Sequence, residues 1–230
     1  MKKIIAIALV LVFALAAVVS CDRGGSSDNG GASDIEKIAA LYAASVPTKS
    51  VTTTTYEFSN RKLTDTATLV TGVIDGEYDA TVLTETTERI RDIDSGSGDR
   101  VQGVIESSTK VTEYLEGSGV RVDGGAWNIS GANFAPTADS IALKLTAETV
   151  KDLKLDGKTY TFTVTKTNTE AVLGYAVDAP VYVTLVHDGA SVVGVTLSYT
   201  LPADAATGTI ETDVTIKIVY TYDIERVSIG

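Results

Sequence analysis

The stretch Val214–Ile224, VTIKIVYTYDI, alternates apolar and polar side chains along almost its whole length. Val, Ile and Tyr occupy every second position, and Thr, Lys and Asp occupy all but one of the positions between them. A period of two residues indicates a β-strand with one apolar face and one solvated face. Such strands are typical of antiparallel sheets, in which one side packs on a core and the other meets water.

The same alternation occurs in several earlier stretches. In Thr159–Thr165, Tyr, Phe and Val alternate with threonines. In Thr52–Phe58, one face carries Thr52, Thr54, Tyr56 and Phe58, and the chain contains 32 Thr in all. Three turn sequences each separate two strand-like runs and predict hairpins: Asp75–Gly76, Glu116–Gly119 and His187–Gly189. Gly and Ser also cluster in Asp94–Asp99 and Gly131–Ser140, which we interpret as loops. The sequence therefore predicts a mainly β fold of the α+β class.

Three short stretches have helical patterns. Ser33 and Glu36 have the spacing of a capping box, and Pro47 ends the amphipathic run that follows them. Thr146–Leu153, with Thr146 as its cap, and Thr169–Leu173 are the other two candidates. Because the apolar face of the strands must be covered, we expect a single large curved antiparallel sheet. This half-barrel or open barrel would carry about three short helices on its concave face. A two-sheet sandwich is the alternative architecture.

The amino terminus has the pattern of an exported chain. Residues 1–20 combine Lys2 and Lys3 with an uncharged run over 4–19, which is shorter than the roughly 20 residues of a spanning helix. These features predict a signal peptide. The run ends in the lipobox-like sequence Val18, Val19, Ser20, Cys21, which resembles that of bacterial lipoproteins.

The lipobox resemblance implies cleavage before Cys21 and transfer of a diacylglyceryl group to its thiol. The expected location is the cell envelope, with the chain anchored to a membrane on its extracytoplasmic side. Cys21 is the single Cys of the chain, so an intrachain disulfide is excluded. We expect residues 21–33 to be the lipidated Cys and a flexible tether, and residues 34–230 to be a single β-rich domain. An ordinary signal peptide or membrane anchor with a chance Cys is the alternative.

Composition narrows the possible functions. The 230 residues carry a net charge of −11, which disfavours binding to nucleic acid. A single His and a single Cys make a structural zinc site improbable, and we expect no metal and no cofactor. The Asp92–Asp99 stretch fails the register of a calcium loop, because Ser97 stands where Gly is needed. We interpret it as a solvated loop.

No catalytic signature stands out in the sequence. His187 falls in a predicted turn and lacks a recognisable nucleophile, so we expect a surface histidine. Trp127 follows two glycines, and its pattern favours a core or hairpin-end position over a ligand platform. We therefore expect a protein that is not an enzyme.

The order of elements is similar to that of the carrier and receptor lipoproteins of the Lol system and of related mycobacterial lipid-binding lipoproteins. The residues that carry this likeness are Tyr114–Trp127, Leu145–Val164 and Val214–Tyr222. The resemblance implies a half-barrel whose concave apolar face, lidded by helices, holds acyl chains. The residues expected to line that cavity are Ile35, Ile38, Leu41, Tyr160, Phe162, Val164, Leu197, Tyr199, Ile216, Ile218 and Tyr220.

Two functions follow as hypotheses. The first is a membrane-anchored extracytoplasmic lipoprotein that binds a lipid or another apolar ligand in a half-barrel cavity. The alternative is a structural or protein-interaction lipoprotein of the envelope, with a packed core and no ligand.

Overall fold

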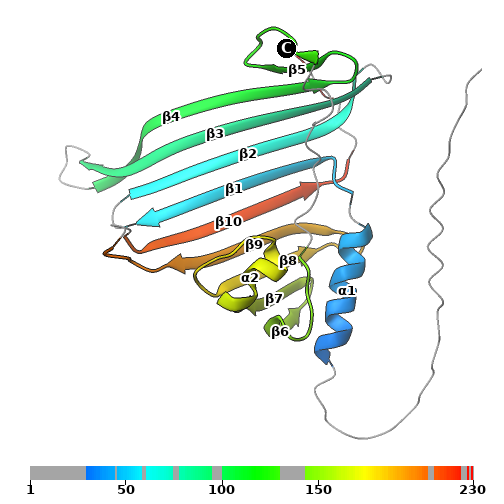
Figure 1. Cartoon of the computed structure of the whole chain (residues 1–230), viewed down its shortest axis with the longest axis vertical. Coiled ribbons are helices and arrows are strands. Elements are labelled where there is room, and N and C mark those ends of the chain that lie inside the picture. The colour runs from blue at the N-terminus through cyan, green and yellow to red at the C-terminus, as the bar shows by residue number, and fades with distance from the viewer. Residues whose placement is uncertain are drawn as a thin grey trace, which may run out of the picture.

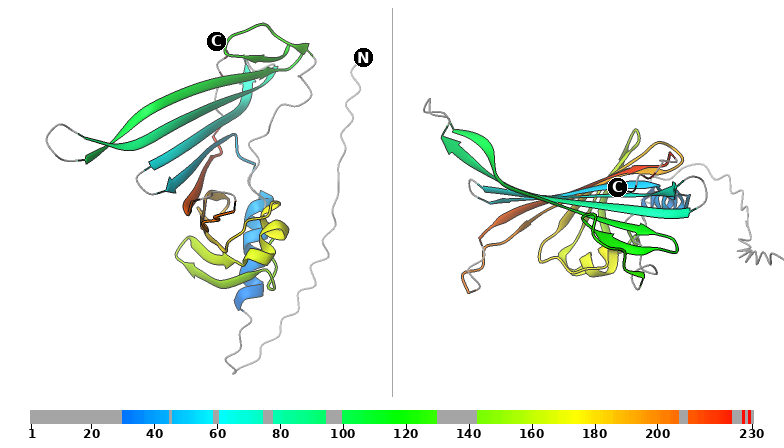
Figure 2. Two further views of the ribbon diagram at one scale, coloured as in Figure 1. Left: turned by 60° about the vertical axis from the view of Figure 1, so that its left-hand side comes forward. Right: turned by 90° about the horizontal axis from the view of Figure 1, so that it is seen from above.

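Ten strands form one antiparallel sheet in a computed structural model that describes residues 30–44, 46–58, 61–74, 78–94, 100–129, 143–206, 210–223, 227 and 229. The sheet is open and twisted (Figures 1 and 2), so the prediction of a mainly β fold built on one large antiparallel sheet is confirmed. The strands are β1 Lys49–Phe58, β2 Arg61–Ile74, β3 Tyr78–Asp94, β4 Arg100–Leu115, β5 Gly119–Val122, β6 Val150–Asp156, β7 Thr159–Val164, β8 Val181–His187, β9 Val192–Leu201 and β10 Thr212–Thr221.

The strand order is β5-β4-β3-β2-β1-β10-β9-β8-β7-β6. Neighbours in sequence are neighbours in the sheet, with the single exception of β5 and β6 among the described strands. β5 and β6 lie at opposite edges, and the first and last strands pair in the middle, with Thr52 opposite Ile218. The sheet therefore consists of two antiparallel meanders, β1–β5 and β6–β10. They are joined where β1 pairs with β10, and β5 and β6 form the two outer edges of the sheet.

Two helices occur among the described residues. α1 spans Gly30–Ala44 and so begins three residues before the predicted cap at Ser33. α2 spans Thr169–Leu173, as predicted, and follows a 3-10 turn at Lys166–Asn168. Both lie at the β6–β10 end of the sheet (Figure 1).

The third predicted helix, Thr146–Leu153, was wrong. The hydroxyl of Thr149 accepts a hydrogen bond from the backbone N–H of Thr146 at 3.0 Å, which closes a tight turn. β6 begins at the next residue, Val150, which is 8% exposed and pairs with Val164 of β7. A β-branched residue at this position packs better in the sheet than in a helix, and tertiary pairing decides the outcome.

The core lies between the two helices and the β7–β10 part of the sheet. One row of residues across these strands consists of Tyr160, Leu185, Val195 and Ile218, each 3% exposed or less. Ile38 of α1, which is fully buried, and Val172 of α2 belong to the same cluster. On this half of the sheet the predicted apolar face is covered by helices, and the opposite face carries threonines.

The same row of residues becomes mainly polar where it enters the other half of the sheet, which consists of β1 to β4. Beyond Ile218 it continues through Thr52, Ala67, Glu85 and Lys110 of β1 to β4. β1 carries threonine on both faces, at Thr52 and Thr54 on the helix side and at Thr53 and Thr55 on the other. In the described parts of β2 to β4, most side chains are half-buried or exposed. The β1–β4 half is thus a single layer, which departs from the expectation of one apolar face throughout.

The predicted hairpins agree with the pairing that is described. β2 pairs with β3, β4 with β5, and β8 with β9. The predicted strand Val120–Ile129 ends early, at Val122, because Asp123 and Gly124 have φ values of 49° and 70°. The turn residues 75–77, the loop residues 95–99 and the predicted loop Gly131–Ser140 lie outside the described residues. Within the described part of the chain, no helix is both long and apolar enough to cross a membrane.

Candidate ligand-binding site

The eleven residues predicted to line a cavity are drawn together by the fold. Seven of them are buried in the core cluster: Ile38, Tyr160, Phe162, Val164, Leu197, Ile218 and Tyr220. Leu41, Tyr199 and Ile216 are partly buried against that cluster, and Ile35 is half-buried on α1. These side chains thus pack mainly against one another. The lipobox residues Val18, Val19, Ser20 and Cys21 lie outside the described residues.

A pocket of about 350 Å³ lies beside α1, at the edge of the core. Lys37 and Leu41 of α1 face Tyr160 and His187 of the sheet across it. Asp34 accepts a hydrogen bond from Lys37 at 2.7 Å, and this bond raises the pKa of the lysine above its ordinary value.

His187 is half-buried at the end of β8 and packs against Tyr160, with ring centroids 5.5 Å apart. Neither ring nitrogen has a hydrogen-bond partner in the part of the chain that the structure describes. The expected surface histidine is therefore partly enclosed, because the turn it was assigned to begins one residue later. Asp188 makes that turn: its carboxylate accepts bonds from the backbone N–H groups of Ala190 and Ser191, which lower the pKa of Asp188.

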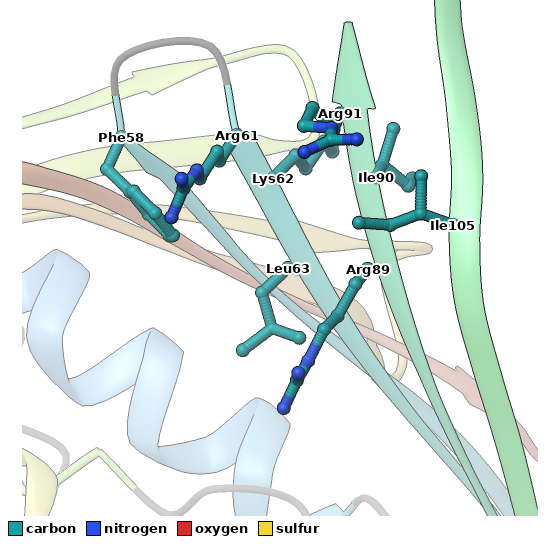
Figure 3. A pocket seen from close by; sticks show the side chains of 8 residues that line it. All are labelled: Phe58, Arg61, Lys62, Leu63, Arg89, Ile90, Arg91 and Ile105. Carbon is teal, nitrogen blue, oxygen red and sulfur yellow. The ribbon is translucent and has the colours of Figure 1, made fainter. Parts of the chain in front are cut away.

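A second pocket, of about 450 Å³, lies at the far end of the β1–β4 half (Figure 3). This volume is within the range of roughly 300–1,000 Å³ that is usual for small-molecule sites. Half of its lining is apolar and half is basic. The apolar side chains are Phe58, Leu63, Ile90 and Ile105, and the basic ones are Arg61, Lys62, Arg89 and Arg91.

Strand register explains how this pocket forms. Phe58 of β1, Arg61 of β2 and Arg91 of β3 are direct neighbours in one row, on the side of the sheet that bears the helices. A β-bulge between Arg89 and Ile90 makes Ile105 the extra residue of β4. Bulges bend a strand and re-aim its side chains, and here Ile105, 51% exposed, borders the pocket.

The basic residues of this pocket were missed by the sequence analysis, although a signal was present. Arg61-Lys62 is the single pair of adjacent basic residues after residue 3. The hairpin predicted at Asp75–Gly76 pairs Ile74 with Tyr78, and the same register places Arg61 opposite Arg91. A two-residue turn at Asp75–Gly76 would instead pair Ile74 with Glu77 and Arg61 with Ile90, so the turn sequence alone does not predict this juxtaposition.

Two further expectations concern the position of Trp127 and the absence of a metal site. Trp127 lies beyond the end of β5, where the guanidinium of Arg121 stacks 4.7 Å from the centroid of its ring. Among the described residues, no group of three or more His, Cys, Asp or Glu is arranged to hold a metal ion. The side chains of Asp92–Asp99, the stretch compared with a calcium loop, lie outside the described residues.

Compared with protein-family models and with the sequences of curated proteins, the chain gives no match.

Proposed function

We propose that this protein is a lipid-anchored extracytoplasmic binding protein, with no catalytic role, that takes an apolar or lipid ligand on the helix side of its sheet. The lipobox-like sequence ending at Cys21 supports the anchor. Two or three acyl chains on one Cys give stable membrane attachment, since each buried CH₂ contributes roughly 0.8 kcal/mol.

The observation that carries the ligand-binding proposal is the pocket bordered by Phe58 and Leu63. Under the helices, residues such as Val164 and Leu185 are fully buried and touch their neighbours, so that region serves as the structural core. At the β1–β4 end, apolar side chains border open space. We therefore place the ligand at this end of the concave face. The core under the helices then serves to stabilise the fold.

The anchor is tested by substituting its thiol. Cys21→Ser is expected to abolish incorporation of radiolabelled palmitate and to release the protein from the membrane fraction. Continued labelling of the variant would refute the assignment of the lipobox.

The ligand is tested by organic extraction of the purified mature protein, followed by mass spectrometry. We expect acyl-containing species from the unaltered chain and a loss of at least fivefold in F58S/L63S. The control I210S/V219S also removes two partly exposed apolar side chains, because Ile210 and Val219 are 52% and 43% exposed, and it is expected to retain the ligand. Equal recovery from both variants, or no recovery from the unaltered chain, would argue against a ligand in this pocket.

A packed core also favours the second candidate, a structural or protein-interaction lipoprotein. β5 covers β4 only from Thr112 to Leu115, and Val104 and Ile105 beyond it are 55% and 51% exposed. Exposed strand edges with apolar side chains are suited to pairing with another chain. Cross-linking from position 104 to a protein partner, together with an empty extraction, would favour this candidate.

A further inference from the structure

The pocket at the β1–β4 end concentrates positive charge in an acidic protein. The chain has 30 acidic and 19 basic residues, yet four basic side chains border this single pocket: Arg61, Lys62, Arg89 and Arg91. Figure 3 shows them at the end of β2 and β3, close to Phe58 and Leu63. Glu57 and Glu106 pair with Lys62 and Arg89, so Arg61 and Arg91 provide the local excess of positive charge that attracts anions.

In the described part of this half, four pairs of charged residues that stand opposite each other on neighbouring strands have opposite signs and form ion pairs. Glu57 bonds to Lys62 at 2.8 Å and Arg89 to Glu106 at 2.9 Å. Glu85–Lys110, at 3.4 Å, and the partly buried pair Glu113–Arg121, at 2.5 Å, follow the same rule. Opposed charges of opposite sign stabilise a sheet, whereas like charges destabilise it.

Arg61 and Arg91 break this rule, because they stand directly opposite each other in the register of β2 and β3. The side chain of neither arginine makes an ion pair or hydrogen bond with any residue that the structure describes. The two neighbouring bases are already engaged, since Lys62 and Arg89 each bond to a glutamate.

A second like-charged opposition shows how such a contact is normally relieved. Glu57 stands opposite Asp213 on β10. Lys62 neutralises Glu57 at 2.8 Å, and the hydroxyl of Thr200 donates to Asp213 at 2.6 Å. The exposed side chains of Arg61 and Arg91 have no corresponding ion pair or hydrogen bond within the described ranges, so both guanidinium groups are available to an anionic ligand.

The space next to this pair is open on the β4 side. The residue opposite Arg91 on β4 is Gly103, which has no side chain to fill the row. On the other side, Arg61 is opposite Phe58. A ligand between the arginines would thus have guanidinium donors at its charged end and an aromatic ring beside it.

We propose that Arg61 and Arg91 together bind the phosphate group of a ligand whose apolar part lies on Phe58 and Leu63. This inference deepens the proposed function and rests on it. A phosphate presents several acceptor oxygens and up to two negative charges, so it can accept paired N–H bonds from two guanidinium groups at once. The shared chemistry is a phosphate group, whether it belongs to a lipid headgroup or to a free phosphate.

The test is calorimetric titration of the mature chain, at low ionic strength, with three probes. Dihexanoyl phosphatidic acid carries both parts of the ligand, dihexanoylglycerol lacks the phosphate, and inorganic phosphate lacks the apolar part. We expect phosphatidic acid to bind at least tenfold more tightly than dihexanoylglycerol. We also expect R61Q/R91Q to lose at least tenfold in affinity for phosphatidic acid.

The matched control is K151Q/K154Q, which removes the same charge from exposed positions on β6 at the opposite edge of the sheet. It is expected to bind like the unaltered chain. Phosphate alone should raise the melting temperature of the unaltered chain but not that of R61Q/R91Q. This second readout also verifies that the variant is folded.

Each outcome has a defined meaning. Tighter binding of phosphatidic acid than of inorganic phosphate supports a lipid source, and equal binding supports a free phosphate. Unchanged affinity in R61Q/R91Q, or equal binding of dihexanoylglycerol and phosphatidic acid, overturns the arginine site but leaves an apolar ligand possible. Failure of all three probes also overturns it, while the extraction experiment judges the proposed function separately.

Discussion

Two tyrosines that enclose the same part of the core differ in how their hydroxyl groups are satisfied. The hydroxyl of Tyr222 donates a hydrogen bond to the carbonyl oxygen of Val192. The hydroxyl of Tyr42, on α1, is buried without a partner among the described residues. Leaving a buried polar group unpaired destabilises a fold by about 1–3 kcal/mol.

Removing these two hydroxyls should therefore change stability in opposite directions. Tyr42→Phe is expected to raise the free energy of unfolding by about 1 kcal/mol, and Tyr222→Phe to lower it by a similar amount. Urea unfolding followed by circular dichroism measures both. A loss of stability in Tyr42→Phe would mean that its hydroxyl has a partner after all.

Burial of tyrosines also predicts the response to alkaline pH. Burial raises the pKa of Tyr199 to about 12, and burial likewise raises the pKa of Tyr42 above its ordinary value of 10.0. Because the unfolded chain loses these protons first, stability is complete below pH 10 and falls as the pH rises through the folded-state pKa values. Denaturant midpoints measured from pH 8 to 12 should decline above pH 10, and Tyr199→Phe should reduce that decline.

At the scale of elements, the local sequence predicted the hairpins correctly and one helix incorrectly. The turn sequences Asp75–Gly76 and His187–Gly189 predicted hairpins whose strands do pair, since the chemistry of a tight turn is short-range. The stretch Thr146–Leu153 was misassigned to a helix because its apolar spacing is ambiguous over eight residues. Pairing of Val150 with Val164, fourteen residues away, determined its structure as a strand.

α1 provides a test of the packed core. Ile38 is fully buried against the sheet, so Ile38→Ala should lower the free energy of unfolding by about 2–5 kcal/mol. Glu36→Ala, an exposed change in the same helix, should alter it by no more than about 0.5 kcal/mol. Chemical denaturation of both variants provides the comparison. Similar midpoints for the two would mean that α1 does not pack as described.

The whole molecule combines a two-layer half with a single-layer half. The sequence predicted one sheet covered by helices, and this holds for β7–β10. The sequence did not predict the uncovered half. Threonines in β1 indicate a solvated face, but they do not indicate whether the opposite face is covered by helices. The arginine pair was missed for a related reason, since it depends on register across two strands rather than on any contiguous motif.

The two halves should differ in local stability. Amides in β8 and β9, which adjoin the buried core, are expected to exchange with deuterium much more slowly than those in the described part of β4. Exchange followed by mass spectrometry of peptic fragments measures this difference. Uniform protection across the sheet would show that the single-layer half is stabilised by something other than the described contacts.

The pairing of β1 with β10 at the middle of the sheet makes the whole sheet depend on one strand pair. β1 to β5 form one array of antiparallel neighbours and β6 to β10 form another, and among the described strands only the β1–β10 ladder joins them. Truncation before residue 212 would remove β10 and leave the two arrays without the strand that connects them.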